Sequence, residues 1–455
     1  MTSDSSSLFC PLEFRYGRES VRAIFSREAR LARALQVEAA LARTEAELGM
    51  IPSADAEAIA RVADTRHVTI DRVDEIERST RHDVMAITLA LGEAAGASGR
   101  WVHYGATSAD ITESALGIEH REALSVLRED LGQLAAVLLA LARRHRETAE
   151  VGRTHGQHGV PFSFGYKMAV AAAEVVRQRH RLDELQPRLA VGKMAGAIGT
   201  GAGFGARAEA VEAGVMRRLG LAADEAPSQI VGRDRLAELA TFLALVAGTA
   251  ERLSTEVRNL QRTEIAEVAE PFDAARQVGS STMAQKRNPI VSENVTSLAR
   301  LIRAFALPPL ENMAQWHERD LSNSANERIV LPHAIVLADD VLTKLTELFR
   351  GLEVDSARMR AVLDEGGGAP MTEALVLALT AKGLARSEAH ESLRRLAHGG
   401  GGSKGLYERA RNDPEIRRLL TEPEIERVLS PAAYVAASAA KTDRVIARLE
   451  RELAK

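Results

Sequence analysis

Hydrophobic residues recur at steps of three and four through much of this chain. One stripe comprises Leu124, Leu127, Leu131, Leu134, Leu138 and Leu141. A second comprises Leu236, Leu239, Leu243, Val246, Ala250, Leu253, Val257 and Leu260. Such spacing places one apolar seam along a helix. The second pattern predicts a helix from about Asp234 to Glu270, roughly 55 Å long.

The dominance of this periodicity predicts an all-α fold, because no alternating strand pattern of useful length interrupts it. A helix of such length needs partners along it, which favours an elongated bundle with seams shared between subunits. A long monomeric bundle fits the periodicity as well. We expect an N-terminal helical part over residues 1–100, a central long-helix bundle over 101–345 and a smaller helical part over 346–455. Glycine runs at 366–368 and 399–402 should break helices in the last part.

Composition narrows the class of protein. The chain has 455 residues, 45% hydrophobic and 27% charged, as expected for a soluble globular protein with more than one structural unit. A net charge of −4 gives no electrostatic case for binding nucleic acid or a membrane surface. We find no signal peptide and no membrane span in the sequence, so we expect a cytoplasmic location. Cys10 is the only cysteine, which excludes an internal disulfide.

Neither a metal nor a cofactor is predicted. The histidines show no paired ligand spacing such as HExxH. The glycine-rich stretch 196–205 lacks the strand and downstream acid of a dinucleotide-binding fold, and we interpret it as a flexible connection between helices.

The segment GSSTMAQKRNP, residues 279–289, carries the most specific chemistry. Hydroxyls, an ammonium and an amide follow a glycine there, which suits a loop that closes over an anionic substrate and takes a proton from carbon. A polar turn before a helix is the alternative from composition alone. In GRTHGQH, His155 beside Thr154 could deliver a proton to a leaving nitrogen, whereas we assign His158 a structural role.

Two further segments offer polar groups near predicted helix starts. TRHDV holds His82 and Asp83, and a helix-start polar cluster explains them equally well. WVHYGATSADIT holds Thr107 and Ser108, whose hydroxyls and turn N–H groups could bind a carboxylate or cap a helix.

Phosphate recognition is the hypothesis for WHERDLSNSANERI. Its Arg319, Ser322, Ser324 and Arg328 combine planar guanidinium donors with serine hydroxyls, and a charged helix surface is the alternative. Near the N-terminus, Arg15 and Tyr16 could add a cation and a phenol.

Taken in order, TRHDV, YGxTSxD, GRTHGxH, QxxxRDR, GSSxMxxKRNP, SEN and WHERDxSxSxxER resemble the blocks of the adenylosuccinate lyase family, within the fumarase/aspartase superfamily. The resemblance runs from FRYGRESVRAIFS to at least ALVLALTAKGLARSEAH. It implies an all-α homotetramer of three-part subunits whose active sites are each built from three chains.

Residue roles follow from the resemblance position by position. Ser280 matches the proton-abstracting serine, His155 the general acid and His82 a second active-site histidine. Lys286 and Asn288 match groups that support the dianionic intermediate, and Glu293 matches an acid that supports the site. The family's contacts to the succinyl carboxylates fall on Thr107, Ser108 and Gln229 of this chain. Its contacts to the nucleotide phosphate fall on Arg15, Tyr16, Arg319, Ser324 and Arg328. Asp83, Thr154 and Ser281 complete the predicted substrate-binding set.

The resemblance implies a lyase that eliminates fumarate from a succinyl-amine, with adenylosuccinate as the leading candidate and the succinocarboxamide ribotide of purine synthesis beside it. Ala284 and Gln285 replace the family's proline and histidine in the signature segment, which leaves a different leaving group open: another N-substituted aspartate or nitrosuccinate. A muconate-type cycloisomerase and a catalytically silent structural homologue are further alternatives. Retention of His155 disfavours the former, and retention of Ser280, Lys286 and His155 disfavours the latter.

Overall fold

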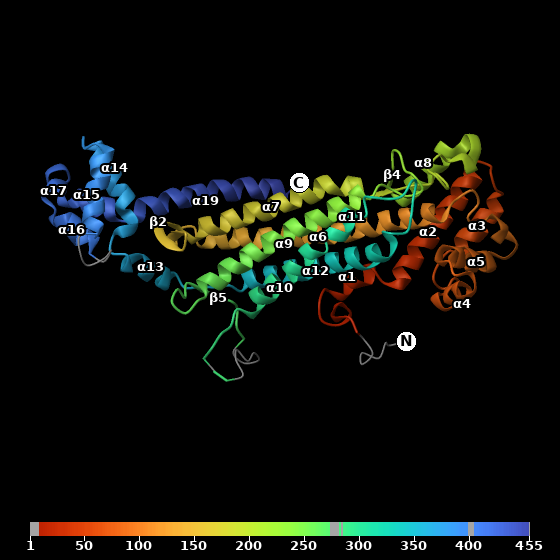
Figure 1. The fold of residues 1–455 in the computed structure, drawn as a ribbon, viewed down its shortest axis with the longest axis horizontal. Coiled ribbons are helices and arrows are strands. Elements are labelled where there is room, and N and C mark those ends of the chain that lie inside the picture. Colours follow the sequence, from red (N-terminus) through yellow and green to blue (C-terminus); the bar gives the residue numbers. More distant parts are fainter. Residues whose placement is uncertain (1–8, 274–281, 284, 399–404, 455) are drawn as a thin grey trace. The chain divides into compact units, whose positions relative to one another are not determined.

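The computed structural model describes residues 9–273, 282–283, 285–398 and 405–454. It divides into two compact units. The first comprises residues 1–130, 178–250 and 297–343, and the second comprises residues 131–177, 251–296 and 344–455. Figure 1 shows the helices and strands that make up the two units.

The N-terminal helices of the first unit enclose an apolar core. They are α2 (Arg27–Glu47), α3 (Ser53–Val62), α4 (Ile70–Thr80) and α5 (Asp83–Ala95), with the 3-10 turn η3 (Gly96–Trp101) packed against them. The 3-10 turn η2 (Pro11–Glu13) and α1 (Glu19–Ile24) precede them along the chain. Helix α2 begins after Ser26, whose hydroxyl accepts the Ala29 N–H as an N-cap. Leu35, Ile59 and Leu91 are fully buried between α2, α3 and α5.

A second core of the first unit joins α2 and the first part of α6 (Ser108–Arg144) to α8 (Ala208–Leu219). Leu41, Ile118 and Val215 fill it. The strand β3 (Val191–Gly192) and the 3-10 turn η4 (Ala202–Arg207) precede α8 along the sequence. The strand β4 (Ala222–Ala223) follows α8 and pairs parallel with β3.

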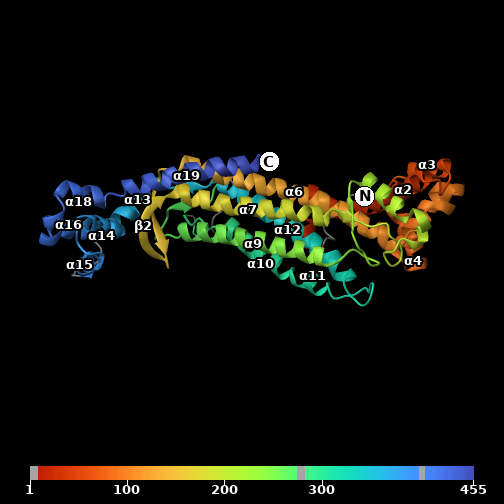
Figure 2. The ribbon, with the colours of Figure 1, turned by 90° about the horizontal axis from the view of Figure 1, so that it is seen from above.

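Of the helices in the described residues, five contribute to both units: α6, α7 (Phe164–Leu189), α9 (Asp234–Leu260), α10 (Ile290–Ala304) and α12 (Ser324–Arg350). Within the first unit, their segments run alongside one another (Figure 2), and the short helix α11 (Leu307–Glu311) lies between α10 and α12 along the chain. Arg128 of α6 pairs with Asp183 of α7 at 2.5 Å, and Gln178 of α7 donates to Thr249 of α9 at 2.9 Å. The two leucine stripes are buried along α6 and α9, as the periodicity predicts.

The predicted extent of the second long helix is wrong. Helix α9 ends at Leu260 and does not reach Glu270. Ala266 takes a left-handed φ of 53°, and the Glu267 N–H returns to the Leu260 carbonyl at 3.0 Å, so the chain turns back there. The strand β5 (Val268–Ala269) then pairs antiparallel with β6 (Glu353–Val354). Apolar spacing continues past the helix end because Val268 is buried in the strand.

The second unit combines a hairpin with a helical C-terminal part. Strands β1 (Ala149–Thr154) and β2 (Gln157–Ser163) form the antiparallel hairpin. The helical part comprises α13 (Ser356–Glu365), η5 (Ala369–Met371), α14 (Thr372–Ala381), α15 (Arg386–His398), α16 (Leu406–Asn412), α17 (Pro414–Leu419), α18 (Glu422–Leu429) and α19 (Ala432–Leu453). Leu375, Leu393, Ile416 and Ile425 form its core.

These elements confirm the all-α fold class, with three short two-stranded sheets added among the described residues. Helix α13 ends just before the first glycine run, as predicted, whereas residues 399–402 of the second run lie outside the described residues. Among the helices described, none is long and apolar enough to cross a membrane.

Candidate active site

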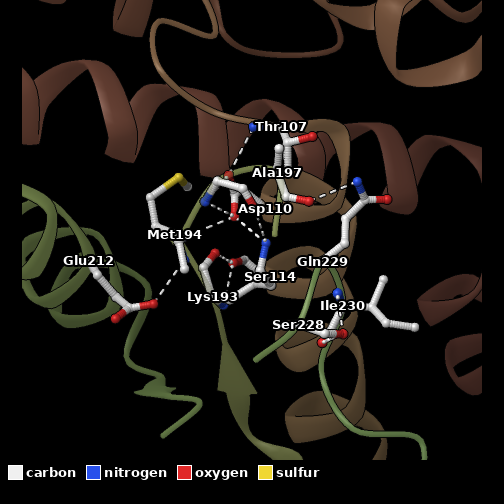
Figure 3. Close-up of polar contacts among 12 residues, drawn as sticks. Thr107, Asp110, Ser114, Lys193, Met194, Ala197, Glu212, Ser228, Gln229 and Ile230 are labelled. Carbon is white, nitrogen blue, oxygen red and sulfur yellow. Dashed lines mark hydrogen bonds and ion pairs between the residues drawn. The ribbon is translucent and has the colours of Figure 1, made fainter. Parts of the chain in front are cut away.

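A buried carboxylate, Asp110, organises the Thr107–Ser108 turn of the first unit. Asp110 and Lys193 are both fully buried, with Oδ1 and Nζ 2.5 Å apart. The Asp110 carboxylate also accepts N–H groups from Thr107 at 2.8 Å and from Ala195 at 3.0 Å. The turn that opens α6 is therefore fastened to the segment after β3 by a charge with several donors (Figure 3).

Gln229 extends this connected set. Its amide donates to the Ala197 carbonyl at 2.9 Å and accepts from the Arg319 guanidinium at 3.0 Å. Ser228 donates to the Glu318 carbonyl at 2.7 Å, which fixes the same two segments together. In Figure 3, Gln229 reaches toward Ala197 from the segment that also carries Ser228 and Ile230. The structure thus connects three predicted site residues, Thr107, Gln229 and Arg319, through Asp110 and residues 195–197.

Lys193 and residues 195–197 are the part of this region that sequence reasoning missed. The glycine-rich stretch 196–205 was expected to be only a connection between helices. Instead, Gly196 donates to Asp110, and a Cβ at Gly199 would lie 2.0 Å from the Pro227 carbonyl, so the backbone passes close to the segment before Gln229. A lysine directly before this stretch was the available signal, since a buried ammonium requires a carboxylate partner.

His82 and Asp83 lie at the start of α5. His82 caps the helix, its Nδ1 accepting the Met85 N–H at 3.3 Å. Asp83 accepts from Arg328 at 2.9 Å. All three side chains are exposed in the first unit. The helix-start interpretation of TRHDV is therefore correct locally, and it leaves the imidazole Nε2 and the guanidinium at the surface, where they can meet a ligand.

Arg233 contacts the start of α12, the part of this helix that carries Ser324 and Arg328. This buried guanidinium binds Glu113 of α6 through two N–H groups, at 2.6 and 2.7 Å, and lies 3.2 Å from Glu327 of α12. Arg233 and Gln229 both belong to the QxxxRDR block. Arg233 holds the start of α12 through Glu327, and Gln229 accepts a hydrogen bond from Arg319, so the block contacts both parts of the predicted phosphate site.

His103, shortly before the Thr107–Ser108 turn, pairs with a buried glutamate of α2, and a second buried glutamate follows on that helix. His103 Nδ1 is 2.7 Å from Glu38 Oε1 of α2. Burial lowers the pKa of His103, but the hydrogen bond and charge of Glu38 outweigh it and leave the pKa above its usual value. Glu45, seven residues further along α2, is fully buried, and burial together with Glu38 raises its pKa to about 8.

In the second unit, Thr154 and His155 occupy the tip of the β1–β2 hairpin. His155 and Gly156 have φ values of 55° and 72°, which is the pattern of a two-residue type I′ turn that matches strand twist. His155 is exposed there. The short turn thus places the exposed imidazole at the end of the hairpin.

Charged contacts brace the hairpin below its tip. Arg153 donates two hydrogen bonds of 2.8 Å to the fully buried carboxylate of Glu267, next to β5. Glu150 of β1 is also fully buried, with Lys167 Nζ 2.9 Å away. Burial raises the pKa of Glu150 to about 7 in spite of that ammonium.

The described end of the signature segment lies in the same unit. Arg287 pairs with Glu353 of β6 at 2.7 Å, and the Arg287 carbonyl accepts from Gln261 at 3.1 Å. Glu270 accepts the N–H groups of Val291 and Ser292 at the start of α10, at 3.0 and 2.7 Å.

Among the predicted residues of this segment, Lys286 and Glu293 are exposed and Asn288 is half-buried. Ser280 and Ser281 lie outside the described residues. Among the described side chains, no group of three or more histidine, cysteine, aspartate or glutamate residues is arranged to hold a metal ion.

Comparison with family models gives two matches. A model described as "Lyase" matches residues 13–303, and one described as "Adenylosuccinate lyase C-terminus" matches residues 368–445.

Curated relatives extend over almost the whole chain. Adenylosuccinate lyase of Pyrococcus abyssi is 43% identical over 97% of this chain and 98% of its own length. That of Pyrococcus horikoshii is 44% identical over the same shares, and that of Methanothermobacter thermautotrophicus is 41% identical over 97% and 99%.

Solved structures show the same architecture. A fumarate lyase from Mesorhizobium sp. BNC1 has a TM-score of 0.85 at 32% identity, covering 95% of this chain and 98% of its own. A 3-carboxy-cis,cis-muconate lactonizing enzyme from Pseudomonas putida has a TM-score of 0.85 at 32% identity, covering 96% and 98%.

Proposed function

Because this chain belongs to the adenylosuccinate lyase family, we propose that it converts adenylosuccinate to AMP and fumarate, and that it acts in the same way on the succinocarboxamide ribotide of purine synthesis. The observation that carries the proposal is the similarity to relatives of that name along 97% of the chain. Retention of Ser280, His155 and Lys286 in the matching blocks supports it.

In the proposed reaction, Ser280 takes the proton from the carbon beside a succinyl carboxylate. A serine hydroxyl needs activation, which exclusion of water and a neighbouring positive charge can provide. The electron pair moves onto that carboxylate as an aci-acid dianion. The ammonium of Lys286 and the amide of Asn288 stabilise the new charge where it develops.

The carbon–nitrogen bond then breaks, and His155 gives a proton to the leaving nitrogen. Its place at the tip of a braced hairpin suits this role, because general acid catalysis needs an imidazole held in one orientation. His82, exposed at the start of α5, is the second histidine of the proposed site, and Glu293 supports it.

Substrate recognition uses the first unit's polar groups. We assign the succinyl carboxylates to Thr107, Ser108 and Gln229, because two hydroxyls and an amide stand at or near the N-terminus of α6, where the helix dipole favours an anion. Arg15, Tyr16, Arg319, Ser324 and Arg328 are assigned to the phosphate. Arg328 pairs with Asp83 at 2.9 Å, so a bound phosphate would compete with that carboxylate.

A related lyase with another leaving group is the second candidate. Ala284 and Gln285 favour it, since they remove a proline and a titratable histidine from the signature segment. The muconate alternative draws support from a neighbour that matches as well as the fumarate lyase in TM-score, but the curated relatives of higher identity weigh against it. The homotetramer, the sharing of sites between subunits and the cytoplasmic location remain predictions.

Incubation with adenylosuccinate tests the proposal. We expect fumarate and AMP in equal amounts, and Ser280→Ala should abolish most of the turnover. Parallel incubations with 3-carboxymuconate and with nitrosuccinate address the alternatives. Absence of turnover and of AMP binding in the intact protein, together with turnover of one of the other compounds, would refute adenylosuccinate as the substrate.

A further inference from the structure

The backbone of the segment that precedes α1 is hydrogen-bonded to α12 on one side and to Arg22 of α1 on the other. The Gly17 N–H donates to Asp340 at 3.0 Å, and the Arg18 N–H donates to Asp339 at 3.1 Å. On the opposite side, Arg22 donates to the carbonyls of Tyr16 and Gly17, at 3.1 and 2.8 Å. Both edges of the peptide groups beside Tyr16 are therefore fixed.

The Arg18 side chain adds hydrogen bonds to Asp339 and to Asp130. Its Nε donates to Asp339 at 2.7 Å, and its terminal nitrogen reaches both oxygens of Asp130, at 2.6 and 2.8 Å. The two aspartate side chains are almost fully buried, at 3% and 0% exposure, on α6 and α12. Arg18 is thus the shared cation of two buried carboxylates, which otherwise repel each other.

Gly17 makes this close approach possible. Its φ is +76°, and a Cβ at this position would lie 2.3 Å from Val336 Cγ1 on α12. Any side chain here would push the segment away from the helix and also strain the backbone.

Apolar packing does not explain the attachment. Phe9 is 95% exposed and Phe14 is 56% exposed, so the aromatic side chains of this segment contribute little burial. Cys10 makes a contact of 3.7 Å with His333 of α12, which is a weak sulfur interaction. The hydrogen bonds of Gly17 and Arg18 therefore attach the end of this segment to α12 and α6.

We propose that Gly17 and Arg18 are positioning residues that set Arg15 and Tyr16 for contact with the phosphate of the substrate. This inference rests on the proposed function, in which those two residues bind the phosphate. Ordering a flexible segment upon binding costs affinity. The hydrogen bonds of Gly17 and Arg18, which we call the clamp, directly follow Arg15 and Tyr16 in the chain. They order this segment before the substrate binds, so the cost does not fall on binding.

The test compares two substrates in three variants. We would measure kcat and KM for adenylosuccinate and for the same compound without its phosphate, in Gly17→Ala, Arg18→Lys and a control, Arg27→Lys. Arg27 lies just beyond the same helix and pairs with Asp74, but its side chain is 68% exposed. We expect the preference for the phosphorylated substrate to fall about tenfold or more in Gly17→Ala, mainly through KM, and to stay unchanged in the control. In Arg18→Lys the loss of preference should be intermediate, because a single ammonium replaces the forked guanidinium donor.

An equal loss for both substrates would overturn the inference, since it would indicate a general role in folding. Hydrogen exchange in the unmodified protein provides a measurement that depends neither on the variants nor on the substrate. The Gly17 and Arg18 amides should exchange slowly without any ligand, whereas exchange as fast as in an unprotected peptide would also overturn it. Slow exchange in a protein that fails to turn over adenylosuccinate would instead refute the proposed function and leave the clamp itself intact.

Discussion

Replacing Glu45 by glutamine should stabilise the protein at neutral pH. The Glu45 side chain is fully buried, and neither of its carboxyl oxygens has a hydrogen-bond partner among the described residues. Burial and the nearby Glu38 raise its pKa from 4.5 to about 8. Between these values the folded protein keeps the proton that the unfolded chain has released.

The sign and size of the effect follow from this difference. Because the folded state binds the extra proton, the free energy of unfolding falls as pH rises from about 4.5 to about 8, at about 1.4 kcal/mol per pH unit. At pH 7 the accumulated loss is about 3 kcal/mol, taken as an upper bound because local relaxation reduces it. Glutamine has the shape of the protonated acid and cannot ionise, so Glu45→Gln avoids the loss.

Thermal unfolding followed by circular dichroism at pH 5 to 8 would measure the effect. The difference in midpoint between Glu45→Gln and the parent should be small at pH 5 and should grow to a few degrees at pH 7. Glu57→Gln is the matched control, since that carboxylate is 63% exposed on the neighbouring α3. A difference that stays constant across this range, or a variant that is less stable above pH 7, would refute the reasoning.

Three other changes test the site itself. Ser280→Ala should lower single-turnover elimination by about 10²-fold or more, and full retention in stopped-flow measurements would exclude Ser280 as the base. Asp110→Asn leaves the buried Lys193 without its charge partner, so the melting temperature should drop by an amount consistent with about 3–5 kcal/mol, together with loss of activity. Glu267→Gln should lower kcat more than it changes KM, because Arg153 then braces the His155 hairpin less firmly; equal activity in both proteins would contradict this.

The sequence predicted the helical architecture well, because apolar spacing reports directly on helix burial. It failed at the end of α9, where Val268 continues the stripe from within a strand and a left-handed Ala266 reverses the chain. Periodicity records which residues are buried and not whether the backbone between them is still helical.

The candidate site was predictable where short motifs carry chemistry, and less so where distant segments meet. Gln229 and Arg319 were identified separately, and the structure shows them in contact. Lys193 and its pairing with Asp110 were missed, because a lone lysine before a glycine-rich stretch has no local pattern that names its partner. The brace between Arg153 and Glu267 likewise joins residues more than a hundred positions apart.

That brace has a further consequence for how variants combine. Glu267 leads through β5 directly to Glu270, whose carboxylate holds the first amides of α10, beside Asn288. Residues 267–270 thus hold both the hairpin, through Arg153, and the start of α10, which follows the signature segment. Kinetic penalties from changes at Arg153 and at Glu270 should be strongly non-additive in a double-mutant cycle, with the second change costing much less once the first has been made.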